Sequence, residues 1–344
     1  MMQTAANLDF RYPTVEDAAW AAPLLRTAGR MGCEYSFTTM FMWRSLYHNR
    51  LARWGDTLFI SAGEESPVYL PPIGPSLADG IRVLLERSAG QERPLTLVGA
   101  DATVVERLED AFPGRFTFTS QRGDFDYIYR TRDLAELPGS AYHAKRNHIA
   151  GFSRKFNWTF EPIDGRNTAE VEAMAQEWCR QKGNCKDKGL RTENCAIREV
   201  LRHREALSVR GGLIRADGRV AAFTFGSPIN DKVFDIQVEK ALPSFPGAYA
   251  VINQAFASTL TGERSGYRGT AQGEALLSSR HGPGKIHLHP GAVRGRAADT
   301  ALFRPGRGAL WPPAPHGPND PLEGDAQEWM ISCRALPVRK TGRP

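Results

Sequence analysis

An Asp-Gly pair at positions 217 and 218 constrains the fold of this chain more than any other short feature. It separates two apolar runs, Gly212–Arg215 and Val220–Phe225, and Asp-Gly between two β-rich runs is a strong signal for a hairpin. A third β-rich run, Val233–Val238, is followed by a loop that contains two prolines. From Gly247 onward, apolar residues recur at helical spacing. The stretch therefore predicts three consecutive strands and then a helix.

The first 130 residues alternate between helix-like and strand-like patterns. Helices are expected at Thr14–Gly29, Ser36–Tyr47, Leu77–Arg87 and Ala102–Ala111, and strands at Leu51–Trp54, Thr57–Ala62, Leu95–Val98, Phe116–Ser120 and Asp126–Tyr129. The aromatic residues of the second helix are candidates for a ligand groove or for the core, and the core is the commoner role. We therefore expect an α/β domain over residues 1–130.

A second α/β unit is expected over residues 131–261. Helices are predicted at Asp133–Phe156, with a break at positions 138 and 139, and at Ala169–Lys182 and Asn194–His203, and a strand is predicted at Trp158–Pro162. The three strands and the helix described above complete this unit. Residues 262–344 are rich in Gly, Pro and Arg and lack apolar periodicity, so we expect a disordered tail there.

The net charge of +6 comes mostly from this tail. From Gly262 onward the chain has 12 Lys or Arg and 7 Asp or Glu, which leaves the rest of the chain close to neutral. A broadly basic surface for nucleic acid is therefore not expected, and any phosphate-binding site has to be local.

Cysteine usage and hydropathy indicate a cytoplasmic protein. The five cysteines show no CxxC pairing, so we expect reduced thiols. Cys179, Cys185 and Cys195 near His203 are irregularly spaced, so packing is favoured over a zinc site and no metal is expected. No apolar run approaches the roughly 20 residues that a membrane helix needs, and the N-terminus lacks the pattern of a signal peptide. We therefore expect no transmembrane segment.

Four segments are similar to one known family. They are SFTTMFMWRSLY, KRNHIAGFSRKFNWTFEPID, GGLIRADGRVAAFTFGSP and GAYAVINQAFA. They resemble the phosphatidylglycerol lysyltransferase C-terminal-like family in its soluble bacterial form. The resemblance covers roughly residues 8–260 and implies an α/β fold of two GNAT-like (acyl-CoA N-acyltransferase-like) domains in tandem, the second incomplete, followed by an irregular tail.

The same resemblance implies an acyl or aminoacyl transferase with an undefined substrate. Relatives move an aminoacyl group from aminoacyl-tRNA to a lipid hydroxyl, so the implied partners are tRNA and a lipid or small-molecule acceptor, with no resident cofactor. Two alternatives stay open, a CoA-dependent N-acyltransferase that uses acetyl-CoA and a catalytically inactive binding protein. The loop LPSFPGAY carries one glycine, which disfavours an acyl-CoA loop. Whether the chain is an active enzyme is left open.

The chain departs from the family pattern at two places. Gln237 stands where relatives often have a histidine. After the helix that contains Asn253, the acidic segment, helix and closing strands of the family are replaced by the Gly/Pro/Arg-rich stretch. Codons for Gly269–Arg280, read in a shifted frame, permit a series close to the missing helix. A frameshifted tail is therefore one hypothesis and a genuine basic tail is the other, and sequencing the gene with longer flanks tests them. A second sheet without its last strands would leave a central strand edge uncovered.

The family's basic helix supplies the candidate phosphate contacts. Lys145, Arg146, Asn147 and His148 are adjacent, and cations of this kind bind phosphate from tRNA, carrier or lipid. The alternative is a solvated basic face, which spacing alone favours. For His148 taken alone, packing or hydrogen bonding is the commoner role.

The remaining candidates lie at the end of the third strand and on the helix after it. Glu239 is a candidate base or a site for an acceptor ammonium group, and Lys240 either contacts substrate or pairs with Glu239. Tyr249 is a candidate acid for the leaving group, with packing as the alternative. Asn253 is a candidate hydrogen-bond donor to the ester carbonyl, with capping of a neighbouring element as the alternative.

Overall fold

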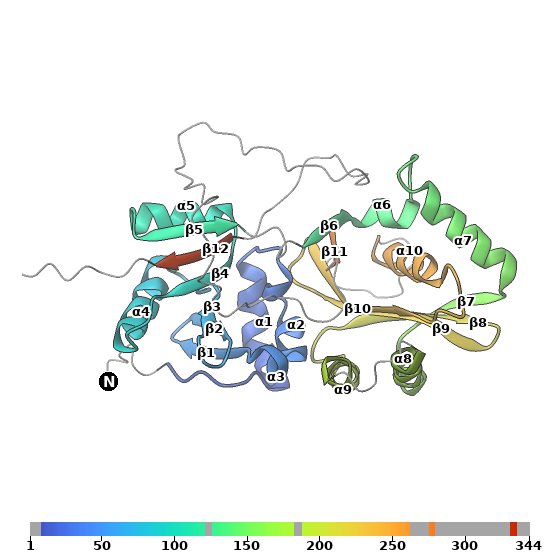
Figure 1. The fold of residues 1–344 in the computed structure, drawn as a ribbon, viewed down its shortest axis with the longest axis horizontal. Helices are drawn as coiled ribbons and strands as arrows, with labels where there is room; N and C mark the ends of the chain where they lie inside the picture. The colour runs from blue at the N-terminus through green and yellow to red at the C-terminus, as the bar shows by residue number, and fades with distance from the viewer. Residues whose placement is uncertain (1–7, 121–125, 182–187, 262–274, 279–330, 336–344) are drawn as a thin grey trace, which may run out of the picture.

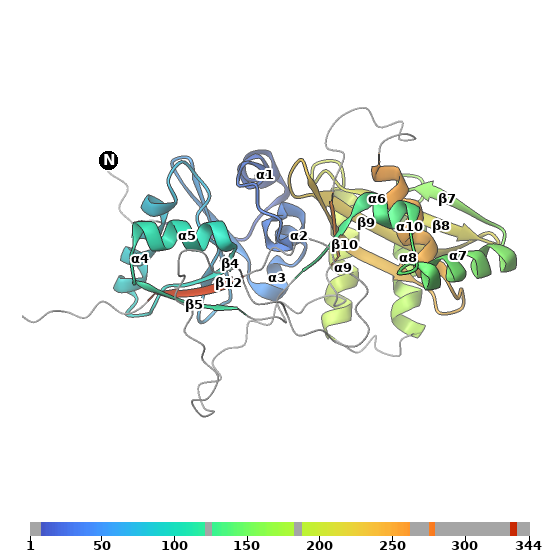
Figure 2. The same ribbon diagram turned by 90° about the horizontal axis from the view of Figure 1, so that it is seen from above.

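The computed structural model describes residues 8–120, 126–181, 188–261, 275–278 and 331–335. Two mixed sheets of six strands each lie at opposite ends of the long axis, and short helices pack between them (Figures 1 and 2). This arrangement confirms the α/β class that the alternating patterns predict.

The first sheet has the strand order β1-β2-β3-β4-β12-β5. Its strands are β1 (Arg50–Trp54), β2 (Thr57–Ala62), β3 (Val68–Tyr69), β4 (Thr96–Ala100), β5 (Phe116–Ser120) and β12 (Ile331–Ala335). The helices α4 (Leu77–Gly90) and α5 (Ala102–Ala111) lie beside this sheet. The part of the molecule around the first sheet is called the first half below, and the part around the second sheet is called the second half. Ser76 and Asp101 cap them, each accepting a hydrogen bond from a backbone N–H of the first turn.

The segment between the sheets comes from the N-terminal part of the chain (Figure 1). It contains the 3-10 helices η2 (Val15–Asp17) and η3 (Cys33–Tyr35) and the helices α1 (Ala18–Thr27), α2 (Phe37–Met42) and α3 (Arg44–Tyr47). The predicted helix over residues 36–47 is interrupted at Trp43, which is 7% exposed and joins the core with its neighbours. The core role of these aromatic residues is therefore confirmed for Phe37, Phe41 and Trp43.

The second sheet has the strand order β6-β11-β10-β9-β8-β7. Its strands are β6 (Tyr127–Arg130), β7 (Trp158–Pro162), β8 (Arg210–Ala216), β9 (Arg219–Pro228), β10 (Val233–Ala241) and β11 (Ala275–Ser278). The expected hairpin is confirmed, because β8 and β9 pair antiparallel and turn at positions 217 and 218. Both turn residues have positive φ, 47° at Asp217 and 80° at Gly218, which is the conformation that Asp-Gly favours.

Helices cover both faces of this second sheet (Figure 1). The helices α6 (Thr131–Glu136), α7 (His143–Lys155) and α10 (Ala248–Leu260) lie on one face, and α8 (Thr168–Gln181) and α9 (Lys188–Arg202) lie on the other. None of the helices in the described part of the chain combines the length and the apolar character needed to cross a membrane.

The two halves share one large apolar core. Leu25 and Phe41 from the first half belong to the same buried cluster as Phe223 and Val251 from the second. A smaller cluster inside the first half packs α4 and α5 against its sheet, and another packs α10 against α6. The halves are therefore joined by buried contacts rather than by a linker alone.

Two strands come from the stretch that the sequence assigns to the tail. In the second sheet β11 pairs parallel to β10 and antiparallel to β6, and in the first sheet β12 lies between β4 and β5. The expectation of an uncovered β10 edge is therefore wrong, because β9 and β11 occupy its two sides. Most of the predicted tail lies outside the described residues, and the division at positions 130 and 261 stays a prediction.

Candidate functional site

A β-bulge in β10 determines which side chains face which helices. The register between β10 and β9 shifts between Ile236 and Val238, so Gln237 is the extra residue. A bulge of this kind interrupts the regular alternation of side chains between the two faces of a sheet. Lys240 consequently contacts α9, and Asp235 contacts α2, which packs against α9, whereas Glu239 contacts α10 on the opposite face.

Glu239 is the central residue of the candidate site. Its Oε2 accepts a hydrogen bond of 3.2 Å from Nδ2 of Asn253, one turn and a half into α10. Burial raises the pKa of Glu239 to about 7, although the Asn253 hydrogen bond and the nearby charge of Lys145 oppose the rise. A carboxyl group with this pKa exchanges protons near neutral pH. The structure therefore brings together three of the candidates, from β10, α7 and α10.

Tyr249 lies in the first turn of α10 with 46% of its surface exposed. Desolvation nevertheless raises the pKa of its hydroxyl, and the nearby backbone of Ala241 and side chain of Trp178 oppose the rise. The ring is thus open to solvent while its hydroxyl end is held near the end of β10. A phenol in this position can donate a proton to a group that arrives from solvent.

Lys240 is placed differently from the expectation. It is 3% exposed, and its Nζ lies 2.9 Å from the Glu193 carboxylate, which is equally buried. The ammonium also lies 3.7 Å from the centre of the Trp178 ring. Pairing with Glu239 is therefore wrong, because the two side chains contact opposite sides of the sheet. Burial lowers the pKa of Lys240 and raises that of Glu193.

The four adjacent polar residues of α7 have different surroundings. Arg146 donates from Nη1 to the backbone oxygens of Leu137 and Gly139, at 2.5 and 2.7 Å, and so fixes the turn between α6 and α7. Asn147 makes a 3.4 Å contact with the ring of His143 in the previous turn. The side chain of His148 is exposed. Lys145 is the member whose charge reaches Glu239.

α7 and α10 approach each other closely at Gly247. This residue has φ of 95°, and a Cβ added there would lie 2.7 Å from the carbonyl oxygen of His148. A glycine is therefore required both for the backbone conformation and for the contact. The close contact fixes the position of the basic helix relative to the first turn of α10.

Sequence reasoning missed a largely buried acidic cluster on the other face of β10. It consists of Glu34 in η3, Asp126 before β6 and Asp235 in β10, with Cys33 beside them. Desolvation and the neighbouring carboxylates raise the pKa of Glu34, and burial raises that of Asp235 to about 7. These residues come from three separate stretches of sequence, so no spacing rule could have found them.

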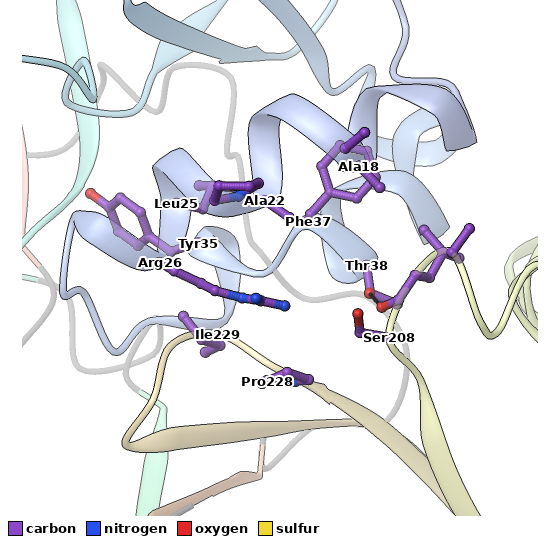
Figure 3. Close-up of a pocket in the computed structure, with 14 residues that line it drawn as sticks. Ala18, Ala22, Leu25, Arg26, Tyr35, Phe37, Thr38, Ser208, Pro228 and Ile229 are labelled. Atoms are coloured by element: carbon purple, nitrogen blue, oxygen red, sulfur yellow. Dashed lines mark hydrogen bonds between the residues drawn. The ribbon is translucent and has the colours of Figure 1, made fainter. Parts of the chain in front are cut away.

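A cavity of about 220 Å³ lies between the two halves (Figure 3). Its walls come from α1, α2, the loop before β8 and the end of β9. They are mainly apolar, with the polar side chains of Arg26, Thr38 and Ser208 among them. The cavity is separate from Glu239, which contacts α10 on the far face of the sheet.

The fold and the bulged strand define the class of protein. Three antiparallel strands, a helix and a strand parallel to the third (β8, β9, β10, α10, β11) form the core order expected of a GNAT-type acyltransferase. A family model described as phosphatidylglycerol lysyltransferase, C-terminal, matches residues 25–275. The chain therefore belongs to this family, as the four segments of its sequence predict.

Solved structures show the same fold. A conserved protein of unknown function from Bacteroides thetaiotaomicron is 31% identical with a TM-score of 0.71, and the match covers 79% of this chain and 90% of that chain. L-PGS from Bacillus licheniformis is 14% identical with a TM-score of 0.54, covering 81% of this chain and 82% of that chain. Among curated proteins no sequence matches this chain.

Proposed function

We propose that this chain is an aminoacyltransferase, which takes its acyl group from an aminoacyl-tRNA and uses Glu239 as the general base. One arrangement supports the proposal most directly. The Glu239 carboxyl has a pKa of about 7, is held by Asn253 and lies within reach of the Lys145 charge. A general base is most effective when its pKa lies near the working pH. Membership of the family supports the donor, since its model is described as a lysyltransferase.

The proposed transfer moves one proton at each end of the reaction. The acceptor hydroxyl gives its proton to the Glu239 carboxylate while its oxygen bonds to the ester carbonyl carbon. The carbon–oxygen bond to the tRNA ribose then breaks, and the ribose oxygen takes a proton from the Tyr249 hydroxyl. Solvent returns the proton from Glu239 to Tyr249, so both groups end in their starting states.

Asn253 and Lys145 position this base rather than exchange protons. Oδ1 of Asn253 is buried and has no hydrogen-bond partner among the described residues, so the amide is held through its Nδ2 bond to Glu239. Lys145 lowers the cost of the carboxylate charge. Within the described ranges none of the α7 cations forms a salt bridge, and Lys145 is the one whose charge acts on Glu239. Its ammonium group is therefore available for a phosphate of the donor.

Acetyl-CoA is the less favoured donor. GNAT enzymes seat a phosphate group at the N-terminus of the helix after the central strand, and here α7 approaches that end of α10. The carbonyl oxygen of His148 lies so close to Gly247 that a Cβ would not fit. This contact restricts the approach of a diphosphate to the first turn of α10.

A transfer assay tests the donor. The full chain is incubated with tRNA carrying a labelled amino acid and with vesicles of phosphatidylglycerol, and a parallel reaction contains labelled acetyl-CoA and an amine. We expect label in the lipid fraction from the tRNA only. Label transfer from acetyl-CoA alone would make the chain an N-acyltransferase, and binding of tRNA without transfer would make it a binding protein.

A matched pair of variants tests the base. Glu239→Gln keeps the shape of the side chain and removes the proton acceptor, so transfer is expected to fall by about 100-fold or more. Glu86→Gln, which changes an exposed carboxylate on α4, is the control and leaves the rate unchanged. Equal rates for the two variants would reject Glu239 as the base.

A further inference from the structure

The largely buried acidic cluster offers three possible metal ligands, two from η3 and one from the residue before β6. The Cys33 thiol and one oxygen each from Glu34 and Asp126 lie within 4.8 Å of one another. Asp235 is close enough to act electrostatically on both Cys33 and Glu34. The backbone N–H of Cys33 donates to Asp126 at 2.9 Å, which fixes η3 relative to the start of β6.

Glu34 gives a second, independent indication of a ligand. Both of its carboxylate oxygens are buried and lack a hydrogen-bond partner within the described part of the chain. The nearest cation along the chain, Arg30, is already paired with Asp101. A buried carboxyl group without donors is costly, and in a native protein it calls for an explanation such as a bound water, a bound ion or a catalytic role.

Two glycines make room for this carboxylate. A Cβ at Gly32 would lie 2.6 Å from one Glu34 oxygen, and a Cβ at Gly99 would lie 2.5 Å from the other. Gly99 also has φ of 70°, and its carbonyl oxygen accepts a 2.7 Å hydrogen bond from the Tyr35 hydroxyl. The backbone is thus shaped around Glu34, which holds its oxygens next to Cys33 and Asp126.

We propose that Cys33, Glu34 and Asp126, with Asp235 beside them, form a binding site for one divalent transition-metal ion, with zinc as the best fit. Zinc takes cysteine sulfur together with carboxylate oxygen, usually with four ligands. Ligands at about 2.0–2.3 Å from one ion lie about 3–4 Å apart, so these side chains have to close by about 1 Å. Such an ion would cross-link η3 in the first half to β6 and β10 in the second, which makes its role structural.

The Cys33 thiol favours a metal ion over an ammonium group as the ligand of this cluster. Carboxylates alone also suit the ammonium group of an amino acid, but a thiol beside them adds nothing to the binding of an ammonium group. Sulfur is by contrast a preferred zinc ligand. The irregular set of Cys179, Cys185 and Cys195 weighed from the sequence is a different group, and Cys185 lies outside the described residues.

Cobalt binding tests the proposal on the full chain, after treatment with a chelator. Cobalt bound by a thiolate absorbs in the near ultraviolet, so we expect this band to saturate at one ion per chain and to disappear when zinc is added. Cys33→Ser is expected to remove the band. Cys195→Ser, which changes an exposed cysteine, is the control and keeps it.

A second variant measures the contribution of Glu34. Glu34→Gln is expected to weaken cobalt binding by at least 10-fold with the stoichiometry unchanged, and circular dichroism checks that the variant is folded. The absence of a cobalt band in the parent chain, or a band of equal intensity in Cys33→Ser, would overturn the proposal. Stabilisation of the chain against thermal unfolding by lysinamide, without any cobalt band, would also overturn the proposal. It would assign the cluster to the binding of an ammonium group.

Discussion

At the scale of single residues, Glu239 links the proposed chemistry to stability. Its pKa is raised by burial from an ordinary value of 4.5 to about 7. The folded state binds this proton more tightly than the unfolded state does. The protonated Glu239 side chain therefore makes its whole contribution to the free energy of unfolding below pH 4.5, and this contribution is lost as the pH rises through 7.

The Glu239→Gln variant should therefore lose a pH dependence. Between pH 5 and 8, the free energy of unfolding of the parent chain should fall by about 2 kcal/mol more than that of the variant, since partial exposure reduces the full effect of the shift. Chemical denaturation at the two pH values measures this. Parallel pH profiles for parent and variant would mean that the carboxyl group titrates normally.

The buried pair of Lys240 and Glu193 gives a second prediction at this scale. Lys240→Met leaves Glu193 buried without its cation, so we expect a loss of about 3–5 kcal/mol in the free energy of unfolding. Lys240→Met combined with Glu193→Leu removes both charges and should recover most of that loss. A double-mutant cycle by urea denaturation measures the coupling. Additive effects of the two changes would contradict the ion pair.

At the scale of elements, the contact between α7 and α10 depends on Gly247. Gly247→Ala places a Cβ 2.7 Å from the His148 carbonyl oxygen in addition to straining a positive φ. Gly218→Ala is the matched control, because its φ is also positive, at 80°, but nothing lies within 4 Å of the added Cβ. We expect the control to lose about 1 kcal/mol from strain and Gly247→Ala to lose clearly more, together with transfer activity.

Urea midpoints of the two glycine variants give this comparison. If both variants lose the same amount of stability, the strained backbone alone explains the effect and the close helix contact contributes nothing.

The elements were largely predictable from local patterns. The Asp217-Gly218 turn fixed the β8–β9 hairpin because its chemistry is local, and the break between α6 and α7 followed from Pro138 and Gly139. The bulge in β10 was not predictable, since it depends on pairing with β9. It decides which face Lys240 occupies, and so brings its ammonium group to Glu193 of α9. Pairing with Glu239 fails for a simpler reason, because adjacent residues of a strand point to opposite faces.

At the scale of the whole molecule, the two halves are expected to unfold together. The core contains side chains from both, and Thr39 of α2 donates a 2.7 Å hydrogen bond to the buried Asp235 of β10. We therefore expect a single calorimetric transition for the chain, and an isolated fragment of residues 8–130 that does not fold. Two separate transitions, or a folded fragment, would contradict a shared core.

The part of the molecule that the sequence could not predict is the interface between the halves. Glu34, Asp126 and Asp235 are brought together by tertiary packing alone, and each one by itself reads as an ordinary surface acid. By contrast, Glu239 and Asn253 were identified because a strand end and the helix after it are neighbours along the chain. Roles assigned to these residues stay predictions until activity is measured.

The most direct measurement is the pH dependence of aminoacyl transfer in a single turnover, with saturating charged tRNA and phosphatidylglycerol vesicles. If Glu239 is the base, the rate of the parent chain should rise with pH and level off above an apparent pKa near 7. In Glu239→Gln the rate should be at least 100-fold lower and should lack this inflection. Transfer by the Gln variant with the rate and pH profile of the parent would contradict the account.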